Sequence, residues 1–66
     1  MSTNEAKRLL KMTAVMWDNN PDDLGMVLEI GSNGFFVDWE NGQRGWIDYR
    51  DAKRVSLFQP RLNNKQ

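Results

Sequence analysis

Five aromatic side chains are the residues of this sequence best suited to hold a ligand. They are Trp17, Phe36, Trp46, Tyr49 and Phe58. Successive side chains of a β-strand point to opposite faces, so in a strand Trp46 must face away from Ile47, and Phe36 away from Val37. At least two large rings should therefore face outward and contact a protein partner or a second copy of the chain. The alternative is that the rings pack beneath the N-terminal segment and only add to the core.

The carboxylates lack partners for catalysis. Asp22 adjoins Asp23, and Asp48 lies close to Asp51, so either pair could be considered for acid–base work. Neither pair is accompanied by the nucleophile or phosphate cradle that a catalytic site would add, because the chain has no histidine, no cysteine and no glycine-rich phosphate loop. The acidic segment 18–23 also lacks the ligand spacing and final glutamate of an EF-hand calcium loop. We therefore predict no catalytic residue, no metal site, no cofactor and no enzymatic activity.

Basic residues are concentrated towards the two ends of the chain. Residues 12–49 are strongly acidic, with Arg44 as their one basic side chain. The flanks carry the candidate nucleic-acid contacts Lys11, Arg50, Lys53 and Arg54. If the ends meet in the fold, they form a basic pole that could hold phosphates while exposed rings stack on bases. Nine basic and nine acidic residues cancel, however, so the dense basic stripe of a nucleic-acid-binding protein is missing.

The length of 66 residues allows one domain. A chain of this size buries about 60% of the surface that its unfolded form exposes, so self-association would add useful burial. The absence of cysteine excludes a disulfide scaffold. No apolar stretch approaches the roughly 20 residues that span a bilayer, and the N-terminus has no signal-peptide pattern. We expect a cytoplasmic protein that makes no membrane contact.

The N-terminal segment, residues 1–10, is predicted to be a short helix or an extended arm. Ser2 and Glu5 have the spacing of a capping box, and apolar residues follow at helical intervals, which favours a helix over 3–10. Isolated helices shorter than about 12 residues are marginal in water. Such a helix would therefore need Leu9 and Leu10 buried against the body of the protein or against another chain.

Residues 11–58 are predicted to form five strands, followed by a polar tail at 59–66. The strand segments are 11–17, 25–30, 35–40, 43–49 and 53–57. Within the third, Phe35, Val37 and Trp39 should share the inner face.

The connections between these strands are predicted from their turn-forming residues. Residues 18–23 are rich in turn formers and include Pro21, which predicts a surface loop. Residues 31–34 suit a tight hairpin. Asn41-Gly42 suits a type I′ turn, which needs positive φ at both central residues. Residues 50–52 predict one 3-10 turn before the last strand.

Four residue patterns stand out along the predicted strands: GMVLEI at 25–30, FVDWENG at 36–42, GWIDY at 45–49 and DAKRV at 51–55. They resemble those of SH3-like β-barrels of the Tudor-like, KOW-type and Mib/Herc2-type groups. The resemblance spans about residues 11–57. It implies an all-β, five-stranded SH3-like barrel; the residue patterns described above add a short N-terminal helix or arm and a 3-10 turn before the last strand. Closure of the barrel would remove exposed sheet edges. Ala52 stands where many relatives carry a larger aliphatic residue, so the N-terminal segment or the extra rings would have to fill the core there.

The resemblance implies binding but does not select a ligand. Barrels of this class bind methylated or proline-rich peptides, RNA, ribosomal surfaces or other subunits, and stand-alone versions occur in bacteria and phages. In Tudor-like barrels an aromatic cage beside a carboxylate holds a methylated ammonium. Here Trp17, Trp46 and Tyr49 would form such a cage, with Asp18 or Asp48 as its acid. We predict a protein-binding or assembly module that self-associates through its N-terminal segment or exposed rings; the alternative is a nucleic-acid-binding barrel. Fold alone does not decide between them.

Overall fold

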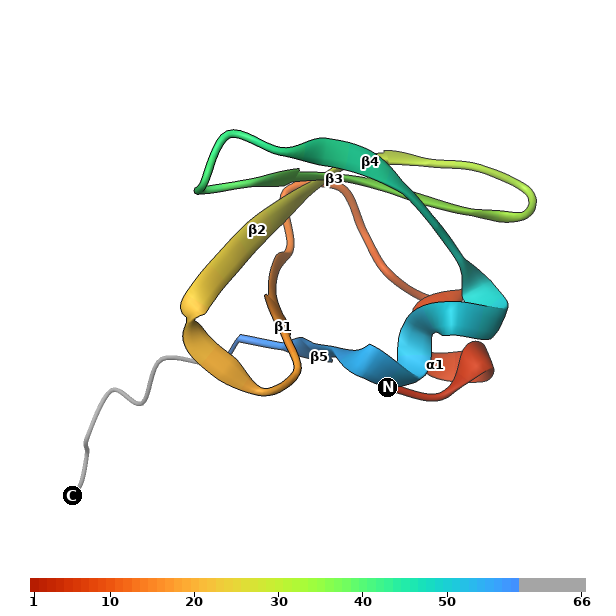
Figure 1. The fold of residues 1–66 in the computed structure, drawn as a ribbon. Helices are drawn as coiled ribbons and strands as arrows, with labels where there is room; N and C mark the ends of the chain where they lie inside the picture. Colours follow the sequence, from red (N-terminus) through yellow and green to blue (C-terminus); the bar gives the residue numbers. More distant parts are fainter. Residues whose placement is uncertain (59–66) are drawn as a thin grey trace, which may run out of the picture.

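The computed structural model describes residues 1–58, and the predicted tail at 59–66 lies outside them. The elements, in chain order, are α1 (Thr3–Ala6), β1 (Ala14–Trp17), β2 (Asn20–Ile30), β3 (Gly34–Trp39), β4 (Arg44–Asp48), the 3-10 helix η1 (Tyr49–Arg54) and β5 (Val55–Leu57). The five strands form one antiparallel sheet in the order β4-β3-β2-β1-β5 (Figure 1). The prediction of an all-β fold is therefore confirmed.

The sheet is open, so the prediction of a closed barrel is not met. β4 and β5 are the two edges of the sheet and are joined by η1 rather than paired with each other. Figure 1 shows the sheet strongly bent, with β3 and β4 over β1 and β5, and with α1 and η1 together at one side. Leu28 is an extra residue in β2 opposite β3, which marks an irregularity of the kind that bends strands. The helices occupy the side where the two edges would have to meet.

The core is formed by the side chains that face the inside of this bend. The largest fully buried ones are Phe35, Val15, Val27, Val37 and Val55. As predicted, Phe35, Val37 and Trp39 share one face, and Trp39 packs against the core at its margin. Ala52 is fully buried, and Ala6 and Leu9 of the N-terminal segment belong to the same core cluster.

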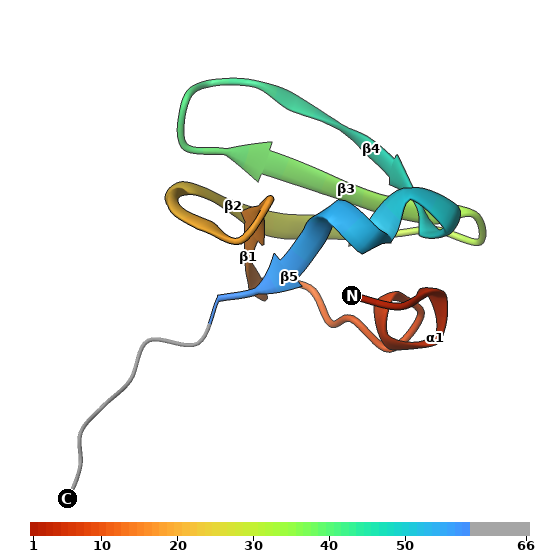
Figure 2. The ribbon, with the colours of Figure 1, turned by 60° about the horizontal axis from the view of Figure 1, so that its bottom comes forward.

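The N-terminal helix is shorter than predicted. The capping box is present: the Ser2 Oγ accepts a hydrogen bond from the Glu5 N–H at 3.1 Å, and the Glu5 Oε1 accepts one from the Ser2 N–H at 2.8 Å. Four residues make too short a helix to be stable alone, so its packing against η1 holds it in place (Figure 2). Leu9 is buried against the body of the protein, as expected, whereas Leu10 is 74% exposed, so its burial against another chain stays a prediction.

The connection between β1 and β2 differs from the predicted surface loop. Asp18 and Asn19 have φ values of 52° and 57°, as a type I′ turn requires, and β2 starts at Asn20 directly opposite Trp17. Leu24 then pairs with Met16, so residues 21–23 stand out of the ladder as a bulge. The predicted loop at 18–23 is therefore a two-residue turn followed by a bulged strand.

The type I′ turn predicted at Asn41-Gly42 does not form. Of its two central residues, only Gly42 has a positive φ, of 93°. The Gly42 N–H donates to the Trp39 carbonyl at 3.0 Å, and the Trp39 N–H donates to the Gln43 carbonyl at 2.8 Å. This is a three-residue hairpin loop with glycine at the left-handed position.

Candidate binding groove

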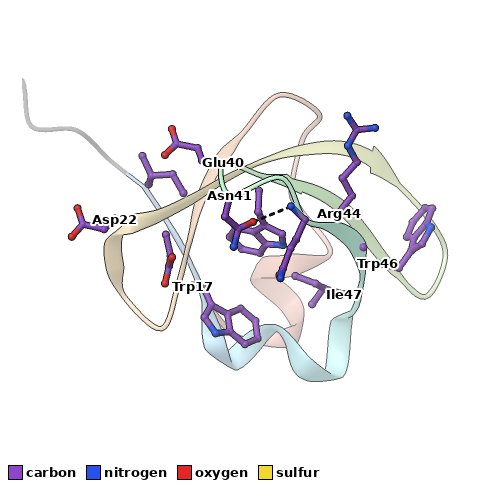
Figure 3. A pocket seen from close by; sticks show the side chains of 12 residues that line it. Trp17, Asp22, Glu40, Asn41, Arg44, Trp46 and Ile47 are labelled. Atoms are coloured by element: carbon purple, nitrogen blue, oxygen red, sulfur yellow. Dashed lines mark hydrogen bonds between the residues drawn. The ribbon is translucent and has the colours of Figure 1, made fainter.

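A groove of about 310 Å³ lies between the start of β2 and the β3–β4 hairpin (Figure 3). Its walls come from β1, β2, β3 and β4 near the end of the core opposite the helices. The residues that line it include Trp17, Asp22, Asp23, Trp39, Glu40 and Gly45. The groove thus forms where the inner face of the bent sheet opens to solvent.

Three indoles line the groove, those of Trp17, Trp39 and Trp46, and the first two are in contact. The Trp17 and Trp39 rings meet edge to face, with centroids 6.1 Å apart and an interplanar angle of 80°. Trp39 lies over Gly25, its partner across the β2–β3 ladder, where a Cβ atom would come within 2.6 Å of the Trp39 ring. The absence of a side chain at Gly25 therefore lets the Trp39 ring settle at the edge of the core.

Three acidic residues lie on the rim of the groove. Asp22 and Asp23 come from the bulge in β2, and Glu40 comes from the β3–β4 loop. Asn20 shapes the bulge, because its side chain accepts a hydrogen bond from the Asp22 N–H at 2.9 Å. Within residues 1–58 none of the three carboxylates has an ion-pair partner. Clustered like charges at the mouth of a low-dielectric groove produce a locally negative potential that attracts cations.

The guanidinium of Arg44 does not neutralise this acidic rim. Arg44 also lines the groove, but its Nε lies 3.2 Å from the Asp38 carboxylate on the outer face of the sheet. The groove therefore combines apolar ring surface with a net excess of negative charge.

Trp17 already carries one cation. The Arg54 guanidinium carbon lies 5.1 Å from the centroid of the Trp17 ring, within the range of a cation–π contact. The same guanidinium donates two hydrogen bonds to the Asp18 carboxylate, at 2.9 and 2.7 Å. These bonds hold the pKa of Asp18 below its usual value and raise the pKa of Arg54. Asp18 is therefore occupied within the chain rather than available to a ligand.

The cage expected from Trp17, Trp46 and Tyr49 does not assemble. Tyr49 is buried, with its hydroxyl donating to the Gly31 carbonyl at 2.7 Å and its ring 6.1 Å from that of Phe35. Since Tyr49 is an interior residue, it is unsuited to the partner contact predicted for it. Trp46 points away from Trp17, and the two rings have different neighbours.

The other predicted contact residues lie in different places. Phe36 and Trp46 face outward together, with ring centroids 5.5 Å apart, so the expected outward pair exists. Phe58 is half-buried just beyond β5, where its N–H donates to the Ala14 carbonyl at 3.0 Å. Asp48 accepts hydrogen bonds from the side chain and backbone of Arg50, which lower its pKa. Among the predicted aromatic contacts, Trp17 and Trp46 line the groove, at separate places in it.

Sequence reasoning missed most of the groove. Trp39 was assigned to the core because it alternates with Val37, and Glu40 was assigned to the opposite face. The bulge brings the Asp22–Asp23 pair, assigned to a loop, alongside the hairpin. A tryptophan at the very end of an inward-facing series was the available signal, because the inner face opens to solvent where a strand ends.

The predicted nucleic-acid contacts are largely neutralised within the chain. Lys11 lies 3.8 Å from Glu29, Arg50 lies 3.2 Å from Asp48, and Arg54 lies 2.7 Å from Asp18. Of the four, only Lys53 has no ion pair within the part of the chain that the structure describes. A phosphate backbone would have to compete with these carboxylates.

Metal binding and membrane insertion are two further functions to consider for residues 1–58. In these residues no three histidine, cysteine, aspartate or glutamate side chains group as metal ligands would. No helix among them has the length and apolarity needed to cross a membrane. Neither the protein-family models nor the curated proteins nor the solved structures contain a match to this chain.

Proposed function

We propose that this chain is a non-enzymatic binding module of SH3-like topology whose groove takes a cationic side chain of a protein partner. The chain path supports the topology: β1 to β4 follow one another as neighbours, η1 precedes β5, and β5 returns beside β1. The bend of the sheet brings its two halves over a common core, as in a small barrel.

The observation that carries the proposed binding activity is the pairing of ring surface with unneutralised acid. A lysine or arginine side chain entering the groove would place its aliphatic stem against Trp17 or Trp39 and its charge near Asp22, Asp23 or Glu40. The contact of the Arg54 guanidinium with Trp17 within the chain supports this placement as an example of a cation on one of these rings. The partner class is therefore a protein segment rich in lysine or arginine.

The role of the acidic residues is tested by titrating the protein with tetra-arginine and tetra-lysine peptides. Binding is measured by the change in tryptophan fluorescence. We expect saturable binding, weakened about tenfold or more, equivalent to about 1.4 kcal/mol, in a variant that combines Asp22→Asn, Asp23→Asn and Glu40→Gln. Glu29→Gln is the control, because Glu29 faces away from the groove and pairs with Lys11. Equal weakening by the control would mean that only the overall charge matters.

Gly45→Val tests the location of the site. Gly45 lies opposite the inward-facing Val37, lines the groove, and a Cβ atom at this position would meet no atom within 4 Å. Valine suits a strand and would fill the groove. We expect the variant to keep its thermal unfolding midpoint and to lose peptide binding. Unchanged binding with the groove filled would overturn the proposal.

The nucleic-acid alternative is tested in the same titration with a single-stranded oligonucleotide. Binding driven by phosphates should weaken steeply with salt and fall when Lys53→Glu is introduced. Salt-sensitive oligonucleotide binding stronger than peptide binding would replace the proposed function by this alternative.

A further inference from the structure

The edge strand β4 carries a free row of backbone groups. β4 is the last strand on its side of the sheet, and the two ribbon views show no other element alongside its outer edge (Figures 1 and 2). Edge strands are usually protected by charged side chains, especially lysine, by proline, by a bulge or by short length. β5 is protected by its three-residue length, whereas β4 has five residues, a regular register, and neither lysine nor proline; its two charged residues, Arg44 and Asp48, are of opposite sign.

The pairing of β4 with β3 fixes which groups are free. The Tyr49 N–H donates to the Asn33 carbonyl at 3.0 Å, and at the other end of the hairpin the Trp39 N–H donates to the Gln43 carbonyl. Hydrogen-bonded and non-hydrogen-bonded pairs alternate along an antiparallel ladder. The odd-numbered residues of β4 therefore direct their N–H and C=O groups to β3. The backbone groups of Arg44 and Trp46 and the N–H of Asp48 point to the free edge, whereas the Asp48 carbonyl opens η1 as its N-cap.

We propose that β4 pairs antiparallel with β4 of a second copy, with Trp46 on the two-fold axis. In this register Trp46 lies opposite the partner copy's own Trp46, and Arg44 lies opposite the partner copy's Asp48. These three residues meet each other, so the free N–H groups of Trp46 and Asp48 and the free C=O groups of Arg44 and Trp46 find partners across the pair; the N–H of Arg44 would share the Asp48 carbonyl with η1. The proposal goes beyond the groove and does not depend on it.

The side chains make this register self-complementary. Arg44, Trp46 and Asp48 share the outer face of the sheet, where Trp46 is 60% exposed. A two-fold interface brings the same patch of both copies together. Here it would place two tryptophans at the centre, each flanked by its own Phe36. At both ends Arg44 would meet the partner copy's Asp48, each exchanging or sharing its exposed partner within the chain, Asp38 for Arg44 and Arg50 for Asp48. Shifting the register by two residues would set Trp46 against Arg44 or Asp48 and shorten the paired segment.

The interface is tested by analytical ultracentrifugation of the full chain and its variants. We expect the wild type to show a reversible monomer–dimer equilibrium. Arg44→Glu places like charges opposite each other twice and should raise the dimer dissociation constant at least tenfold. Asp48→Lys should do the same. Lys53→Glu makes the same charge change as Arg44→Glu on an exposed residue outside β4, and should leave the equilibrium unchanged.

Mixing the two weakened variants tests the register itself. Arg44→Glu and Asp48→Lys together restore opposite charges at both ends of the strand pair, so their equimolar mixture should form a heterodimer tighter than either homodimer. Asp48 also caps η1 by accepting a hydrogen bond from the Arg50 N–H at 2.9 Å, so circular dichroism must show that Asp48→Lys is folded. If Asp48→Lys is not folded, Trp46→Pro is measured alone in place of the mixture. Trp46→Pro removes an N–H that β3 does not use, so it should yield a folded monomer.

Three outcomes would overturn the proposal. The first is a wild type that stays monomeric at millimolar concentration. The second is a dimer that Arg44→Glu does not weaken. The third is the absence of a heterodimer when both parent variants are folded.

Discussion

Individual glycines in this fold differ in what a side chain would meet. At Gly34 a Cβ atom would lie 2.2 Å from the carbonyl oxygen of Ile47, which is backbone and cannot move aside without disturbing the β3–β4 ladder. At Gly45, on the neighbouring strand, a Cβ atom would meet nothing within 4 Å. One glycine therefore permits close approach of two strands, whereas the other keeps a groove open.

This contrast predicts opposite results for the same substitution. Gly34→Ala should lower the free energy of unfolding by about 1–3 kcal/mol, as overpacking does. Gly45→Ala should be neutral or stabilise by up to about 1 kcal/mol, since glycine costs conformational entropy in a strand. Urea unfolding of both variants beside the wild type is the measurement. Equal losses would show that the strand geometry at these two sites is not as described.

At the scale of elements, the N-terminal segment acts as a cover for the sheet. α1 is stabilised by its capping box and by the burial of Ala6 and Leu9 beside η1. The N-terminal ammonium donates hydrogen bonds to the carbonyl oxygens of Ala52 at 3.0 Å and of Val55. These contacts join the start of the chain to η1 and β5 and fill the space beside the small residue Ala52.

Leu9 and Leu10 provide a matched pair for testing this role. Leu9→Ala should cost about 2–5 kcal/mol, because it removes a buried side chain and leaves a cavity. Leu10→Ala should change stability by no more than about 0.5 kcal/mol, because its side chain is largely exposed. Thermal and urea unfolding measure both. A large loss for Leu10→Ala would indicate that this side chain is covered by a second copy in solution.

For the whole molecule, we expect the free energy of unfolding to decrease at acid pH. Hydrogen bonds from the Arg54 side chain lower the pKa of Asp18, and those from the side chain and backbone of Arg50 lower that of Asp48. The backbone N–H and the hydroxyl of Ser2 lower the pKa of Glu5. A carboxylate whose pKa is lower in the folded state favours folding above its unfolded pKa, and this contribution disappears as the pH falls through the folded pKa.

We therefore expect an unfolding midpoint that is steady from pH 7 to about pH 5 and falls as the pH passes below the ordinary carboxyl values near 4. Asp18→Asn should make this acid-side decline shallower, because it removes one of the groups responsible. Asp22→Asn is the control, as Asp22 has no ion-pair partner within residues 1–58. A decline equally steep in Asp18→Asn and the wild type would contradict the assignment to the Asp18–Arg54 pair.

The sequence by itself determined the local structure and much of the core. Alternating residues from Phe35 to Trp39 identified an inner face, and the Ser2–Glu5 spacing identified the helix cap, because both depend on neighbours within a few positions. It did not determine the turn types. Asp18 and Asn19 accept positive φ only because β1 and β2 pair immediately on either side of them, whereas Asn41 does not adopt it.

Only the tertiary structure decided where the candidate sites lie. The three-residue bulge in β2 brings two aspartates to the β3–β4 hairpin, and the bend of the sheet opens the groove beside Trp39. The same bend leaves β4 at an edge instead of closing the barrel, which exposes the backbone of Arg44, Trp46 and Asp48. Register, bulges and closure arise from pairing between distant segments, so residue types along one strand do not specify them.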